Sequence, residues 1–422
     1  MLIFGASTLL LLLLSGGLVR CFRGTASLWF CGYLGWLLLA APFSVWKGGT
    51  FETLRSAFLT EFSLFFVIAG LTRTIGELRK LCAAVAIGGT FTLVYCGWMG
   101  GNDTGRLSLP FGTLQNPNDL AIHLLLALPF VALLFYAGKG MLRLLAIPTA
   151  AGLLYAVLLT GSRMALVVTA LIVVFVLVRS TMTQRLAMVG VFAIAGVMAL
   201  VFMPALTIQR YLTVFSSQPA TIVDLEEYQG AVGSTEARMA LLRTSIKMTI
   251  QNPLFGAGPG QFAVEEEALQ KEMGRRGSWQ VTHNTYTQVS SEAGIPALFF
   301  YCAAILAAMF GMHRIYKFAA RRNDPDSRLL VHMAFCLRLA LVTIALCSMF
   351  GSLAYRSYLP MILGLSVAFT AAATRLVERL AATPSPATNT RPFLPSPRLN
   401  PRPAPLAAPG RSTAFGHPAP GQ

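Results

Sequence analysis

A histidine and an asparagine stand side by side in THNTYTQVSSEAG, the stretch Thr282–Gly294 that leads into a long apolar run. Histidine has an ordinary pKa of about 6.5, so its neutral ring can take a proton from a hydroxyl group near pH 7. His283 is therefore a candidate general base, and a polar residue at a membrane interface is the alternative interpretation. Asn284 either orients the ring or a bound hydroxyl group, or caps the helix that follows.

Two arginines could bind an anionic group. Arg163 lies in TGSRMAL between two apolar runs, where an arginine is costly unless it faces a cavity or a partner. Arg238 lies in STEARMALLRTSIKMTIQNP, which predicts a helix capped by Ser234 or Thr235 and ended by Pro253. Guanidinium groups bind phosphate oxygens in a bidentate manner. The alternatives are snorkelling of Arg163 to lipid headgroups and a solvated helix face at Arg238.

Four further features carry weaker signals. Arg243 follows Arg238 on the predicted helix and is a further candidate for substrate binding, as is Asn284. The stretch NPLFGAGPGQF (252–262) could form a nest of backbone N–H groups for an anion or, more simply, a turn between two helices. The run Glu265–Glu267 reads as a solvated helix face. Asp324 and Asp326 in RRNDPDSR are typical of a turn, so we expect a site without a metal ion or cofactor.

The elements that position these residues must be membrane helices. The chain has 422 residues, 55% hydrophobic and 12% charged, with a mean hydropathy of +0.63; soluble domains carry about 25% charged residues. Apolar runs near the roughly 20 residues that cross a bilayer as a helix recur, without the alternation of β-barrel strands. We predict an all-α integral membrane protein with about 11–12 transmembrane helices and one large, partly helical extracytoplasmic loop. Eleven spans are identified: 2–19, 26–46, 57–73, 79–98, 119–137, 144–161, 164–178, 187–204, 292–312, 332–352 and 357–374.

The basic residues indicate the topology. Most of them fall on alternate connections, which the positive-inside rule predicts to be cytoplasmic. The net charge of +16 therefore reports orientation rather than a nucleic-acid surface. The connections 99–118, 161–163 and 205–291 are then predicted outside the cytoplasm.

Four regions follow from this pattern. We predict N-terminal transmembrane helices at 1–204, an extracytoplasmic catalytic loop at 205–291, C-terminal transmembrane helices at 292–374 and a disordered, Pro-rich cytoplasmic tail at 375–422. Seven cysteines, none in the large loop, imply no disulfide framework.

Together the motifs resemble the O-antigen ligase and polymerase superfamily of bacterial membrane glycosyltransferases. The resemblance is carried by His283–Asn284 followed by nine residues and Gly294, by the segment from STEAR to FGAGPGQF, and by GSR at a short outer connection. It covers most of the chain, from the third predicted span onward. In the ligase pattern a second glycine follows three positions later, where this chain has Ala297.

The resemblance implies a function and a site. The donor would be a glycan on undecaprenyl diphosphate, with Arg163 and Arg238 on the diphosphate and His283 as base. The acceptor would be a hydroxyl group of a lipid A-core sugar or another glycan, on the periplasmic side of a bacterial inner membrane. The transfer would need no metal and would invert the anomeric centre. The alternatives are a repeat-unit polymerase of the same superfamily, a protein O-oligosaccharyltransferase, and a polysaccharide transporter.

Overall fold

A computed structural model describes residues 11–101, 106–179, 182–202, 204, 207–208, 211 and 222–382. Within these residues every regular element is a helix, which confirms the all-α prediction. The compact unit Met1–Arg379 holds nearly all of them, and of the second unit, Leu380–Gln422, only the end of the last helix is described. Of the tail predicted to be disordered at 375–422, residues 375–382 form the end of α16, and the remainder lies outside the described residues.

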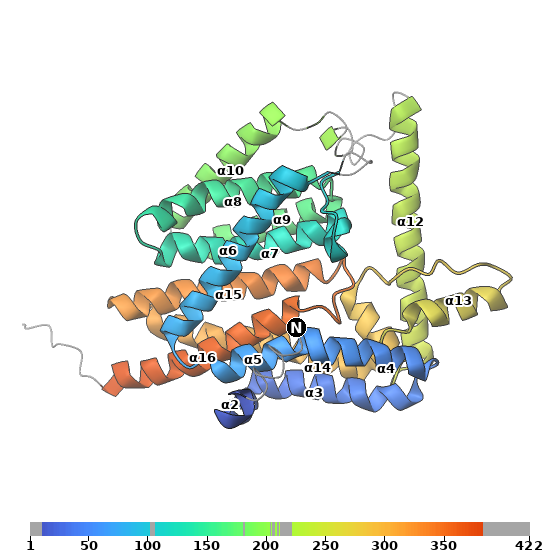
Figure 1. Ribbon diagram of the computed structural model, residues 1–422, viewed down its shortest axis with the longest axis horizontal. Coiled ribbons are helices and arrows are strands. Elements are labelled where there is room, and N and C mark those ends of the chain that lie inside the picture. Colours follow the sequence, from blue (N-terminus) through green and yellow to red (C-terminus); the bar gives the residue numbers. More distant parts are fainter. Residues whose placement is uncertain are drawn as a thin grey trace, which may run out of the picture. The chain divides into compact units, whose positions relative to one another are not determined.

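The helices follow the chain in the order of Figure 1. Their bounds are α2 Gly17–Cys21, α3 Thr25–Ala40, η1 Ala41–Phe43, α4 Lys47–Ser56, the π-helix η2 Ala57–Phe62, α5 Ser63–Leu71, α6 Ile75–Met99, η3 Gly112–Gln115, α7 Pro117–Ala137, α8 Met141–Leu159, α9 Arg163–Arg179, α10 Met182–Phe202, α12 Ile222–Gln251, α13 Phe262–Glu272, α14 Thr285–Ala319, α15 Pro325–Cys347 and α16 Tyr358–Ala382.

The apolar helices confirm an integral membrane protein. Among the described residues eight helical segments are long and apolar enough to cross a bilayer: Thr25–Phe43, Lys47–Leu71, Ile75–Met99, Pro117–Ala137, Met141–Leu159, Thr285–Ala319, Pro325–Cys347 and Tyr358–Glu378. The spans predicted at 164–178 and 187–204 correspond to the shorter apolar helices Arg163–Val178 and Arg185–Ala199.

Two predicted spans differ from the structure. The span 2–19 lies partly outside the described residues, and its described part is interrupted by a turn at Ser15 and Gly16. The span 332–352 was placed too late, because the helix begins at its Asp324 cap and ends at Cys347. Residues 348–357 therefore form a connection rather than the end of a membrane helix.

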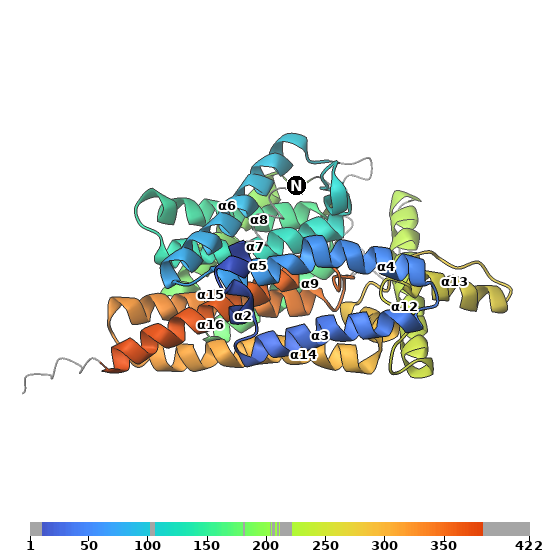
Figure 2. The same ribbon diagram turned by 60° about the horizontal axis from the view of Figure 1, so that its bottom comes forward.

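The spanning helices lie side by side, and α12 runs across them near one end (Figures 1 and 2). α3 packs along α14, while α7 packs against α6, α8 and α15. A hydrogen bond of 2.8 Å between the hydroxyl groups of Thr249 and Ser290 joins α12 to α14. α12 begins at Ile222, so Ser234 and Thr235 lie inside the helix and do not cap it as predicted; its end at Gln251, just before Pro253, agrees with the prediction.

The glycine-rich turn that follows α12 packs against a break in α14. Gly294 has φ 84° and ψ 172°, a backbone conformation essentially restricted to glycine, and it interrupts the helix. The turn donates N–H groups to the freed carbonyls of α14, with 2.8 Å from Ala257 to Ser291 O and from Gly258 to Glu292 O. The Ile295 N–H in turn donates to Pro253 O at 2.7 Å. The turn between two helices is thus confirmed, and it fastens the extramembrane segment to the bundle.

Candidate active site

His283 is held in an unusual backbone conformation at the start of α14. Its φ is 54°, in the left-handed region that non-glycine residues rarely adopt and that recurs at functional sites. The His283 N–H donates to Ser352 Oγ at 2.9 Å, and the Thr282 and Ser352 hydroxyl groups lie 3.2 Å apart. Thr282 is 2% exposed. These contacts fix the backbone of His283 and leave its side chain to line the cavities described below.

Asn284 caps α14. Its Oδ1 accepts the N–H groups of Tyr286 and Thr287 at 3.0 and 3.1 Å, and its Nδ2 donates to Met349 O at 3.2 Å. The capping interpretation of Asn284 therefore describes the structure, and the residue also lines the cavity that contains His283. An N-cap amide that also binds the next connection fixes the relative position of the two segments.

The connection 348–357 is the second wall of the site. Thr285 Oγ1 donates to Gly351 O at 2.6 Å and accepts the Leu353 N–H at 3.0 Å. The Thr285 N–H donates to Ser348 O at 2.7 Å. Backbone and side-chain bonds thus join the start of α14 to the segment between α15 and α16.

Arg163 is positioned by the tight connection between α8 and α9. Gly161 has φ 58°, which permits the turn, and Ser162 Oγ donates to Asn118 Oδ1 at 2.9 Å. Arg106 Nε donates to Thr160 O at 2.8 Å. This connection is therefore fastened to the start of α7, and Arg163 begins α9 with its side chain half-buried.

The structure brings Arg163, Arg238, His283 and Asn284 together around one cavity of about 410 Å³, which we name the arginine cavity. They come from α9, α12 and the start of α14. Its other lining residues are mostly apolar: Met164, Val167, Met239, Leu242, Thr282, Met349 and Phe350. Two guanidinium groups beside apolar walls suit a ligand with an anionic head and a lipid body.

A second cavity of about 430 Å³ adjoins the first, and we name it the polar cavity. Both are lined by Arg238, His283 and Phe350, so His283 stands where they meet. The remaining polar residues that line it are Thr53, Ser56, Glu61, Asn116, Asn118, Asp119, Gln288, Glu292, Ser352, Tyr355 and Arg356. Glu292 is 3% exposed, and its Oε2 accepts from Tyr355 Oη at 2.7 Å and from the Gly260 N–H at 2.9 Å.

The surroundings of His283 favour its neutral form. Burial and, to a smaller extent, the positive charge of Arg238 lower the pKa of His283 below its usual value. Both effects disfavour the imidazolium. The ring is therefore available as a proton acceptor at neutral pH, which is the state that a general base requires.

Other candidates lie elsewhere. Arg243 is exposed on α12 and lines neither of the two cavities. The prediction that Glu265–Glu267 form a solvated face was wrong in part, because Glu266 is buried and accepts the Ser278 N–H at 2.9 Å. Glu267 accepts the Gly277 N–H. These two carboxylates bind the segment at Gly277 and Ser278 that leads to His283. The sequence pattern around the glutamates gave no signal for these hydrogen bonds.

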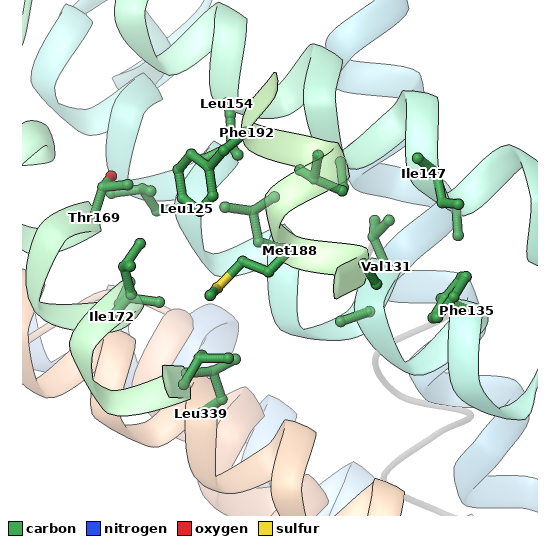
Figure 3. Close-up of a pocket in the computed structure, with 18 of the residues that line it drawn as sticks. Leu125, Val131, Phe135, Ile147, Leu154, Thr169, Ile172, Met188, Phe192 and Leu339 are labelled. Carbon is green, nitrogen blue, oxygen red and sulfur yellow. The ribbon is translucent and has the colours of Figure 1, made fainter. Parts of the chain in front are cut away.

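A third cavity, of about 140 Å³, lies inside the bundle between α7, α8, α9, α10 and α15. Figure 3 shows Met188 and Phe192 facing it, with Ile172 and Leu339 on other sides. None of its lining residues is charged, and Thr169 and Tyr136 supply its polar groups. It fits hydrocarbon rather than a diphosphate.

Sequence comparison agrees with this architecture. The helices define a multi-pass membrane protein. Residues 148–302, from α8 to the first half of α14, match the family model described as O-antigen ligase. The match contains Arg163, Arg238 and His283, and it confirms the predicted resemblance to the O-antigen ligase superfamily. The comparison with curated proteins found no match.

Proposed function

We propose that the protein is a glycosyltransferase that moves a glycan from undecaprenyl diphosphate to an acceptor hydroxyl group, as an O-antigen ligase does. The observation that carries this proposal is the junction of two cavities at His283, with Arg163 and Arg238 around one of them. The family match supports the superfamily, in which glycan and lipid-linked substrates are expected.

The chemistry needs one base and two cations. The acceptor oxygen attacks C1 of the donor sugar, the C1–O bond to the diphosphate breaks, and His283 takes the proton of the acceptor hydroxyl group. Undecaprenyl diphosphate leaves with an added negative charge, which Arg163 and Arg238 stabilise. The lipid diphosphate is a good leaving group, so the transfer needs no protein acid. Attack from the face opposite the diphosphate inverts the anomeric centre.

The position of the site fits a lipid-linked donor. The arginine cavity lies at the start of the apolar helices α9 and α14, and apolar side chains form much of its wall. We assign this end of the bundle to the periplasmic side of a bacterial inner membrane, because most basic connections lie at the opposite ends of the helices. The lipid donor and the sugar acceptor then meet at the membrane surface.

A repeat-unit polymerase is the second candidate, because the same superfamily includes ligases and polymerases. Deletion of the gene distinguishes the two through the sizes of surface and lipid-linked glycans. A ligase predicts long chains retained on undecaprenyl diphosphate beside a bare acceptor. A polymerase predicts an acceptor that carries a single repeat unit. An unchanged glycan profile would contradict both assignments for that glycan.

A further inference from the structure

The polar cavity has a different composition from the arginine cavity beside it. Its distinctive side chains do not line the arginine cavity: Glu61 comes from the π-helix η2, Asn118 and Asp119 come from the first turn of α7, and Arg356 comes from the connection before α16. That connection gives only Met349 and Phe350 to the arginine cavity. With a volume of about 430 Å³ it falls within the roughly 300–1,000 Å³ typical of small-ligand sites.

The charges of this cavity argue against a diphosphate. Three carboxylates line it, the half-buried Glu61 and Asp119 and the buried Glu292. They outnumber its two cations, the exposed Arg356 and the half-buried Arg238, which it shares with the arginine cavity. Carboxylates near a diphosphate would repel it, and the cost grows as water is excluded. Carboxylates do accept hydrogen bonds from hydroxyl groups. The cavity therefore fits a hydroxyl-rich, uncharged ligand.

The backbone that presents Glu61 is itself unusual. Ala57–Phe62 forms a π-helix between α4 and α5, and such segments are rare and frequent at functional sites. Thr53 and Ser56 at the end of α4 and Ala57 of the π-helix also line the cavity. Asp119 lies in the first turn of α7, which Asn116 caps by accepting the Asn118 N–H at 2.9 Å.

The family match separates the two arginines and His283 from the side chains that distinguish the polar cavity. Arg163, Arg238 and His283 all fall within residues 148–302, whereas Glu61, Asn118, Asp119 and Arg356 all fall outside them. The part of the chain that matches the ligase family thus supplies the residues that we assign to binding of the undecaprenyl diphosphate donor. The polar cavity draws on both parts of the chain, because Gln288 and Glu292 lie inside the match.

We infer that the polar cavity is the acceptor subsite, and that Glu61 and Asp119 bind hydroxyl groups of the acceptor sugar and select it. This inference rests on the proposed function. In the polar cavity an acceptor hydroxyl group lies beside His283, while the donor sugar reaches His283 from the arginine cavity. Glu61 and Asp119 act as specificity residues and leave the diphosphate contacts unchanged.

The test measures binding of the two substrates separately, with the full chain in lipid nanodiscs. The probes are a neutral, phosphate-free hexose oligosaccharide and undecaprenyl diphosphate. Glu61→Gln and Asp119→Asn keep the side-chain shape and remove the charge. Because hydrogen bonds to charged groups are stronger than neutral ones, each variant should weaken oligosaccharide binding by about tenfold and leave undecaprenyl diphosphate affinity within about twofold. Glu52→Gln, on the exposed face of α4, is the matched control and should change neither.

Either of two results would overturn the inference: oligosaccharide affinity equal to wild type in both variants, or a parallel loss of undecaprenyl diphosphate affinity. Binding also separates this inference from the proposed function. A protein that binds both probes but transfers no glycan contradicts the proposed reaction, and the variants still report on the acceptor subsite. Unchanged diphosphate binding shows that each variant is folded.

Discussion

Replacing Gly294 with alanine should detach the glycine-rich turn from α14. The residue has φ 84° and ψ 172°, and a Cβ there would overlap the carbonyl group of Leu254 and lie 2.8 Å from Pro253 O. Both obstacles are backbone atoms, so a rotamer change cannot relieve them. The turn must move away, and its hydrogen bonds with α14 are then lost.

The magnitude follows from two contributions. A non-glycine residue in this backbone region costs about 1–3 kcal/mol. Displacement of the turn removes the bonds from Ala257 to Ser291 O, from Gly258 to Glu292 O and from Ile295 to Pro253 O, each contributing about 1 kcal/mol. We therefore expect Gly294→Ala to lower the stability of this region by about 4–6 kcal/mol, enough to open the turn locally.

Hydrogen exchange read by mass spectrometry measures this directly. The peptide that contains Ala257 and Gly258 should lose its protection in Gly294→Ala, together with a lower unfolding temperature. Gly35→Ala is the matched control, because a Cβ on Gly35 meets no heavy atom within 4 Å and alanine is favoured in a helix. It should be neutral or slightly stabilising. Wild-type protection of the turn in Gly294→Ala would refute this account of the break.

Three other predictions concern the reaction. Arg163→Lys keeps the charge and loses the bidentate geometry, so donor affinity should fall by about tenfold or more in a binding assay; unchanged affinity would contradict a diphosphate contact. Ser352→Ala removes the hydroxyl group that accepts the His283 N–H at 2.9 Å, so kcat should fall while donor affinity stays constant. An unaltered kcat would show that this hydrogen bond does not position the base. Burial and, second, Arg238 lower the pKa of His283, so activity should persist below pH 6.5, the usual value, and decline as the pH falls through the lowered pKa. Arg238→Gln should move that decline to higher pH. A pH profile in which activity does not decline at acidic pH would argue against His283 as the base. The same sign holds for stability, since protonation of the unfolded chain below about pH 6.5 disfavours the folded state.

The residues of the arginine cavity could be identified as candidates from the sequence, because residue type and context both gave a signal. Arg163 and Arg238 are cations where the topology made an anion ligand reasonable, and His283 precedes a membrane helix. The structure gathers these three residues around one cavity. Asn284 had two open interpretations from sequence, and its capping bonds are now visible.

The other residues of the polar cavity could not be predicted from local patterns. Ser352 was included in a membrane span, because the segment after Cys347 is apolar enough to extend the helix. Glu292 lies in the first turns of α14 and looks like one polar residue of an interfacial stretch, and its bond to Tyr355 depends on contacts far apart in sequence. Arg356 was the available sequence signal for this cavity, because it is a charged residue close to the predicted outer end of a membrane span.

The most direct test of the central assignment is glycan transfer by His283→Ala. The purified variant, reconstituted in lipid vesicles with an undecaprenyl-diphosphate-linked glycan and a lipid A-core acceptor, should bind undecaprenyl diphosphate as the wild type does. Its transfer rate should fall by at least about 100-fold, the usual contribution of a general base. A transfer rate close to that of the wild type, from a stably folded His283→Ala protein, would contradict the account.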